Sequence, residues 1–173
     1  LFRQPENPRM PEAAEVVEAL LAAPDIESVP VNDRVNAASI LFNYLNWKTK
    51  GTSADALIQR VEPWLADPAV TAVNRVWWQV HRAFNEQIRG HYARSQKIMK
   101  DTEAFAEAHG LKWVQVEIYH AEVTALVSSG DVDGAAAALA KLRSVLNPSR
   151  RMDLAYFHYQ EAGVLMLQNR TRD

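Results

Sequence analysis

Apolar residues recur along most of this chain three and four positions apart, which is the spacing of one helix face. No segment alternates apolar and polar residues over several positions, so the pattern predicts no β-strand. Glycine and proline lie almost wholly between the periodic segments. These breaks predict eight helices: residues 12–23, 33–49, a third that Ser53 caps and that ends before Pro68, then 70–89, 91–108, 111–128, 132–146 and 150–169.

The helix ends carry specific signals. Asn32 or Asp33 is placed to cap the second helix, because a short polar side chain there can accept a backbone N–H. Gly51 is expected to end that helix. Pro63 lies inside the third helix and is expected to kink it or shorten its last turn.

The breaks recur about every 40 residues. Gly51, Gly90 and Gly130 follow alternate predicted helices, and the spacings between them are 39 and 40 residues. Aligning the last two glycines places Ser95 opposite Ala135, a small residue five positions after each glycine. One helix pair cannot bury its apolar face alone, so repeated pairs stack on one another. We therefore expect a solenoid of helix pairs in which Ala135 lies where a paired helix packs closely.

Residues 1–11 contain three prolines and are expected to form a linker. Residues 12–173 would then form a single helical-repeat domain. Both ends of the sequence look cut, and we expect a fragment of a larger chain whose exposed ends self-associate.

Composition restricts the possible functions. Hydrophobic residues make up 48% of the 173 residues and charged residues 23%, which is typical of a soluble globular protein. The formal net charge is −2, so no basic field is present to bind nucleic acid directly. The absence of cysteine excludes disulfides, thiolate metal sites and cysteine nucleophiles. No apolar run is long enough to span a membrane, and we expect a cytoplasmic location.

Catalytic and metal motifs are weak. Glu117 and His120 have the Glu-x-x-His spacing of di-iron helix bundles, but the chain offers only a reversed partner in His158 and Glu161. The segment 130–134 is similar to a calcium loop without the acidic twelfth ligand. No nucleophile elbow or phosphate-binding loop is present. We expect no catalytic residue, cofactor or metal, and the alternative of an all-helical enzyme or metal bundle stays open.

The turn after the sixth predicted helix resembles the tetratricopeptide (TPR) repeat. The matching residues are Gly130, Asp131, Ala135, Leu139, Leu142 and Pro148. The resemblance implies an all-α, right-handed α-α superhelix of TPR-like helix pairs, with a period near 40 instead of 34 residues. Lengthened pairs of this kind are similar to the helical sensor region of MalT- and LuxR-type multidomain bacterial transcriptional regulators.

The TPR-like register also implies a concave groove. The side chains expected to line it are Trp77, Val80, Phe84, Gln87, Glu117, His120, Thr124, Phe157 and Gln160. Such a groove suits a peptide helix or a small effector. Aromatic residues at helical spacing are more often core, so inter-helix packing stays open for each position.

These observations lead us to expect a non-enzymatic sensor or protein-interaction segment of a bacterial transcriptional regulator, which acts in signal transduction by binding a protein, peptide or small effector. A stand-alone TPR adaptor that scaffolds a complex is the alternative.

Overall fold

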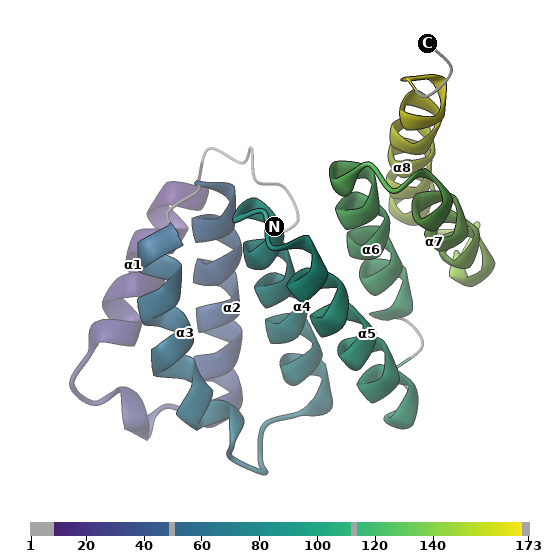
Figure 1. Ribbon diagram of the computed structural model, residues 1–173. Coiled ribbons are helices and arrows are strands. Elements are labelled where there is room, and N and C mark those ends of the chain that lie inside the picture. The colour runs from purple at the N-terminus through teal and green to yellow at the C-terminus, as the bar shows by residue number, and fades with distance from the viewer. Residues whose placement is uncertain (1–8, 49–50, 112–113, 171–173) are drawn as a thin grey trace. The chain divides into compact units, whose positions relative to one another are not determined.

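The computed structural model describes residues 9–48, 51–111 and 114–170. These residues form eight α-helices, one short 3₁₀ helix and no strand, which confirms the all-α prediction (Figure 1). The elements are α1 (Met10–Ala22), η1 (Ile26–Ser28), α2 (Val31–Trp47), α3 (Gly51–Leu65), α4 (Ala72–Ile88), α5 (Tyr92–Ala108), α6 (Gln115–Ser129), α7 (Val132–Val145) and α8 (Arg151–Arg170). Across the described part of the chain, no helix has the length and apolar character needed to cross a membrane.

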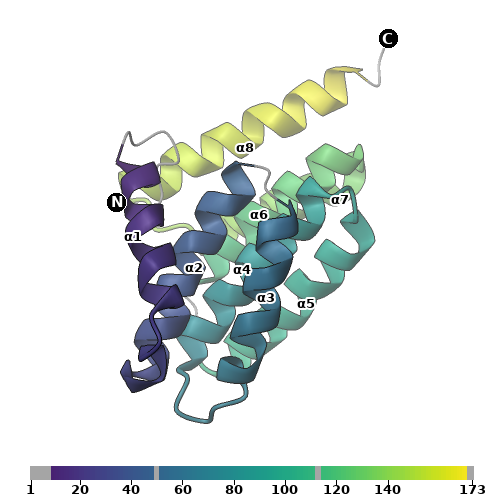
Figure 2. The same ribbon diagram turned by 90° about the vertical axis from the view of Figure 1, so that its left-hand side faces the viewer.

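The chain divides into two compact units, Leu1–His81 and Arg82–Asp173. α4 contributes residues to both. In the first unit, α2 packs against α1 and α3 (Figure 2). The core of this unit is formed by the fully buried Val35 and Phe42 of α2, Val61 of α3 and Trp78 of α4. The rings of Phe42 and Trp78 lie 4.9 Å apart between centroids, so α4 is anchored on α2 through aromatic packing.

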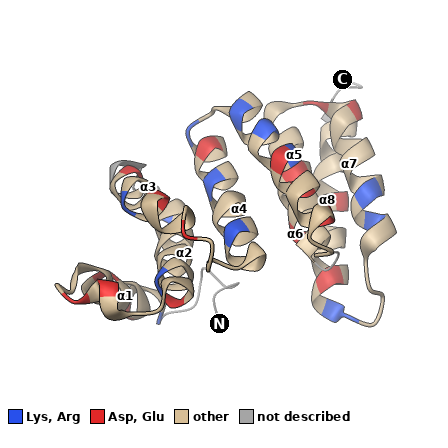
Figure 3. Cartoon of the chain, turned by 90° about the horizontal axis from the view of Figure 1, so that it is seen from below, with Lys and Arg blue, Asp and Glu red and all other residues tan. Residues whose placement is uncertain are grey.

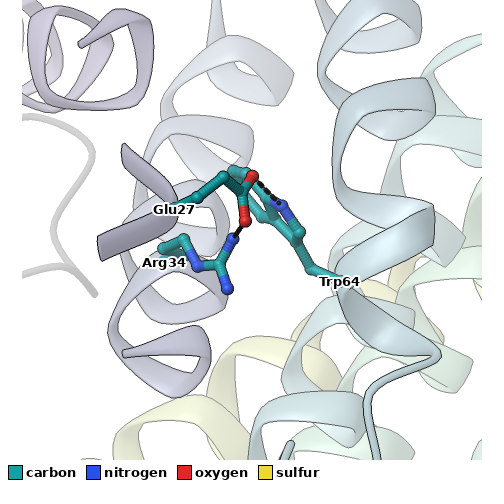
Figure 4. A network of polar contacts seen from close by, with 3 residues as sticks. All are labelled: Glu27, Arg34 and Trp64. Carbon is teal, nitrogen blue, oxygen red and sulfur yellow. Dashed lines mark hydrogen bonds and ion pairs between the residues drawn. The ribbon is translucent and has the colours of Figure 1, made fainter. Parts of the chain in front are cut away.

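A polar network joins three elements of the first unit (Figure 4). Arg34 Nη1 donates a hydrogen bond to Glu27 Oε2, and Trp64 Nε1 donates to Glu27 Oε1 at 3.1 Å. The Arg34 guanidinium also lies 5.0 Å from the centroid of the Trp64 ring. The Trp64 hydrogen bond and the Arg34 charge lower the pKa of Glu27. The network therefore holds η1 and α3 against the start of α2.

The predicted cap of α2 was wrong. Pro30 occupies the N-cap, and Asn32 lies inside the helix. The Asn32 side chain instead reaches the segment before α4: it accepts from the Thr71 N–H at 2.9 Å and donates to the Ala69 carbonyl at 2.8 Å. Asn74 also donates to Asn32 Oδ1 at 2.9 Å. Because the amide meets several partners there, it is not available to cap its own helix.

The boundary between α2 and α3 also differs from the prediction. α2 ends at Trp47, and Gly51 is the first residue of α3 instead of the end of α2. Ser53 therefore lies within the first turn and does not precede the helix. Pro63 lies inside α3, which continues to Leu65.

The start of the chain is helical earlier than expected. α1 begins at Met10, which is buried, so the last two residues of the predicted linker belong to this helix. Residues 1–8 lie outside the described part of the chain. Pro11 occupies the first turn of α1, where its missing N–H costs no helix hydrogen bond.

In the second unit, α6 contacts α5, α7 and α8, and α7 contacts α8. Its core around α7 includes Val123, Leu126, Ala135, Ala138 and Val164. Ala135 is fully buried, as expected for a small residue at a close helix contact.

Three glycines end helices as predicted. Gly90, Gly110 and Gly130 have φ values of 77°, 68° and 78°, a left-handed conformation that glycine adopts without a Cβ penalty. In each case the next residue donates its N–H to the carbonyl five positions back, for example from Asp131 to Leu126 at 3.0 Å. This pairing is the Schellman motif. Asp131 then caps α7 by accepting from the Gly134 N–H at 2.9 Å.

Candidate functional site

The groove positions from α4 lie in different environments. In the first unit, Val80 is buried and Trp77 is half-buried, with its ring centroid 6.2 Å from that of His81. In the second unit, Phe84 is half-buried and Gln87 is buried. Gln87 Nε2 donates to the Ala121 carbonyl at 3.2 Å, so this side chain joins α4 to α6.

The structure brings three of the predicted groove residues together between α6 and α8. Gln160 is buried, and its Nε2 lies 2.9 Å from His120 Nδ1 and 2.7 Å from Thr124 Oγ1. The Thr124 hydroxyl donates in turn to the His120 carbonyl at 2.9 Å. The His120 and Tyr156 rings lie 4.8 Å apart between centroids. We call these four residues, His120, Thr124, Tyr156 and Gln160, the α6–α8 cluster.

The hydrogen bonds of the α6–α8 cluster are mutually consistent. An amide NH₂ carries two hydrogens, and Gln160 directs one to His120 and one to Thr124. His120 Nδ1 is then an acceptor, which assigns its proton to Nε2 in the neutral imidazole. The buried amide holds two turns of α6 in a fixed position against α8. His120, Thr124 and Tyr156 are only half-buried, so part of the cluster faces solvent.

The remaining groove residues differ in exposure. Phe157 is buried, and the guanidinium of Arg143 from α7 lies 6.0 Å from its ring centroid. Phe157 therefore packs in the core near α7. Glu117 is half-buried in the first turn of α6, where its charge is favourable near the positive end of the helix.

The metal motifs considered from the sequence do not converge. Among the described residues, no group of three or more His, Asp or Glu side chains could hold a metal ion. His158 instead pairs with Glu161 on α8, with 3.2 Å between Nδ1 and Oε2, and both side chains are accessible to solvent.

Charges of both signs are interspersed along α4 and α5 (Figure 3). On α5, Lys97 forms an ion pair with Asp101, with 2.6 Å between Nζ and Oδ2. At the end of α4, Glu86 Oε2 lies 2.8 Å from His91 Nδ1 and 3.6 Å from Arg94 Nη1. Neither helix therefore presents a continuous basic stripe of the kind that binds a phosphate backbone.

No family model, curated protein or solved structure matches this chain. Its function is therefore inferred from its own residues and their contacts.

The sequence did not predict two features of the second unit, a polar contact made by Tyr119 and the place of Tyr156 in the α6–α8 cluster. Tyr119 donates from its hydroxyl to Glu103 Oε1 at 2.6 Å, and Lys141 lies 5.5 Å from the Tyr119 ring centroid. Burial and the Glu103 hydrogen bond raise the pKa of Tyr119. This arrangement joins α5, α6 and α7, and no local motif in the sequence signals it. Tyr156 was also missed, although it lies one helix turn before Gln160.

Proposed function

We propose that this chain is a non-enzymatic protein-interaction segment built from TPR-like helix pairs. α5 and α7 begin 40 residues apart, at Tyr92 and Val132, and a left-handed glycine precedes each by two positions. α6 contacts its following helix α7 and also α8, as stacked helix pairs require. These contacts support an α-α superhelix with a period near 40.

The α6–α8 cluster is the binding surface that we propose within this segment. It combines a neutral imidazole, a hydroxyl and an aromatic ring on two helices, and a buried amide fixes their positions. A rigid surface with a few oriented polar groups is suited to bind a peptide or a small effector. The double hydrogen bond of Gln160 is the observation that carries this proposal, because it organises the surface before any ligand arrives.

The experiment selects helical peptides by display on the purified chain and measures their affinity by calorimetry. We expect His120→Ala to weaken binding at least about tenfold, which corresponds to about 1.4 kcal/mol. His158→Ala is the matched control, because it removes an exposed histidine from the unit without touching the cluster. Equal affinities for the two variants would contradict the proposal, as would a failure to select any peptide.

The role in a bacterial transcriptional regulator rests on the resemblance of the lengthened helix pairs to such sensor regions. The test is the open reading frame that encodes this segment. A DNA-binding or ATPase module in the same polypeptide would support the regulator. A reading frame with neither module would favour a stand-alone adaptor.

A further inference from the structure

α8 carries a row of exposed residues spaced alternately three and four positions apart. The row, which we call the α8 seam, consists of Met152, Ala155, Tyr159, Ala162 and Met166. Met152, Tyr159 and Met166 are 48%, 71% and 59% exposed. This spacing is the heptad pattern by which two helices pair along a shared seam.

The α8 seam lies on the side of the helix opposite the core. Asp153, Phe157, Gln160 and Val164 are buried, and they recur on the face that meets α6 and α7. The seam residues fall about half a turn away from them in an α-helix. Packing within the second unit therefore leaves the seam exposed.

Large and small residues alternate along the seam. Two helices that pair in parallel would place Tyr159 against Tyr159 of the other helix and Ala162 against its Ala162. Successive layers of the interface would then hold two large side chains or two small ones. In an antiparallel pair the two kinds of position face each other. Tyr159 then meets Ala162 of a second copy and Met166 meets its Ala155, so every such layer holds one large and one small side chain. Even layers give the dense packing that protein interfaces need.

We propose that α8 pairs antiparallel with α8 of a second copy of this chain, about a two-fold axis between Tyr159 and Ala162. The axis makes the interface self-complementary, as a closed dimer requires. About two heptads of contact form a small interface, so the dimer is weak and depends on protein concentration.

Sedimentation velocity of the whole chain over a range of concentrations tests the pairing. We expect reversible dimerisation, and Tyr159→Glu should raise the dissociation constant at least about tenfold because it places two charges in the central layers. Val16→Glu is the matched control, since Val16 is 70% exposed on α1 and the same charge is introduced. Circular dichroism checks that both variants remain helical. A chain that stays monomeric, or equal effects of the two variants, would overturn the proposal.

Disulfide trapping tests the direction, because the chain has no native cysteine. Ala155→Cys mixed with Met166→Cys should form a crosslinked heterodimer on oxidation, whereas Ala155→Cys alone should crosslink little. A parallel pair would give the reverse result, because Ala155 would face its own copy. That reverse result would overturn the antiparallel seam.

Discussion

Ala135 lies fully buried on α7, in the cluster that includes Val123 and Val164. We expect Ala135→Leu to destabilise the chain by about 1–3 kcal/mol, because the larger side chain must displace well-packed neighbours. Ala137→Leu is the control, since this alanine is exposed on the same helix and the helix propensities of the two changes are equal. Urea unfolding measures both. Equal effects at the two positions would show that α7 does not pack through Ala135.

His81 makes the stability of the first unit dependent on pH. Its ring centroid lies 6.3 Å from that of Phe42 and 6.2 Å from that of Trp77, and burial lowers its pKa from 6.5 to about 4. The folded state therefore favours neutral histidine, and the unfolded state takes up the proton first as pH falls. This contribution to stability is complete above pH 6.5 and is lost as pH falls from there to about 4.

We expect this pH change to lower the free energy of unfolding by roughly 1–2 kcal/mol through His81. This is less than the about 1.36 kcal/mol that each unit of pKa shift would give for a fully buried group, because part of the side chain remains accessible to solvent. His81→Phe keeps an aromatic ring at this position and cannot titrate. The free energy of unfolding, measured by urea titration at several pH values, should therefore fall less steeply for the variant over this window. Parallel curves for both proteins would contradict the assignment.

At the scale of the elements, two glycines of the second unit make a matched pair. Gly130 has a φ of 78°, and a Cβ added there would meet nothing within 4 Å, so Gly130→Ala should cost about 1–2 kcal/mol for backbone conformation alone. Gly163 lies inside α8, where an added Cβ would meet Val127 Cγ1 at an ordinary 3.7 Å. Gly163→Ala should therefore stabilise the chain by about 0.5–1 kcal/mol. Thermal unfolding of both variants should show shifts of opposite sign.

The helix ends explain which elements the sequence could predict. A Schellman motif needs only one glycine and the preceding turn, so the ends at Gly90, Gly110 and Gly130 could be predicted locally. The start of α2 could not, because Asn32 bonds to residues 37 and 39 positions away. A polar side chain near a helix end can bind partners that only the folded chain brings close. When those partners are distant in sequence, the local pattern of residues does not indicate them.

At the scale of the whole molecule, repeat register predicted part of the candidate site. His120 and Gln160 are 40 residues apart, and the same period that assigned both to one surface brings them into contact. The register could not distinguish exposed from buried members. Phe157 lies 40 residues after Glu117, at the same periodic position, but Phe157 is buried near Arg143 of α7 whereas Glu117 is half-buried. Side-chain size and the exact helix rotation decide that outcome, and periodicity carries neither.

Pairing through α8 would also change the thermal stability of the whole chain. Only folded copies present the α8 seam, so mass action stabilises the folded state by about 1.4 kcal/mol when the protein is roughly tenfold above the dissociation constant. For a chain of this size that corresponds to a midpoint about 3–6 °C higher. Calorimetry should therefore show a midpoint that rises with protein concentration in the unmodified chain and in Val16→Glu. The rise should disappear in Tyr159→Glu, and a midpoint that is independent of concentration in all three would count against the pairing.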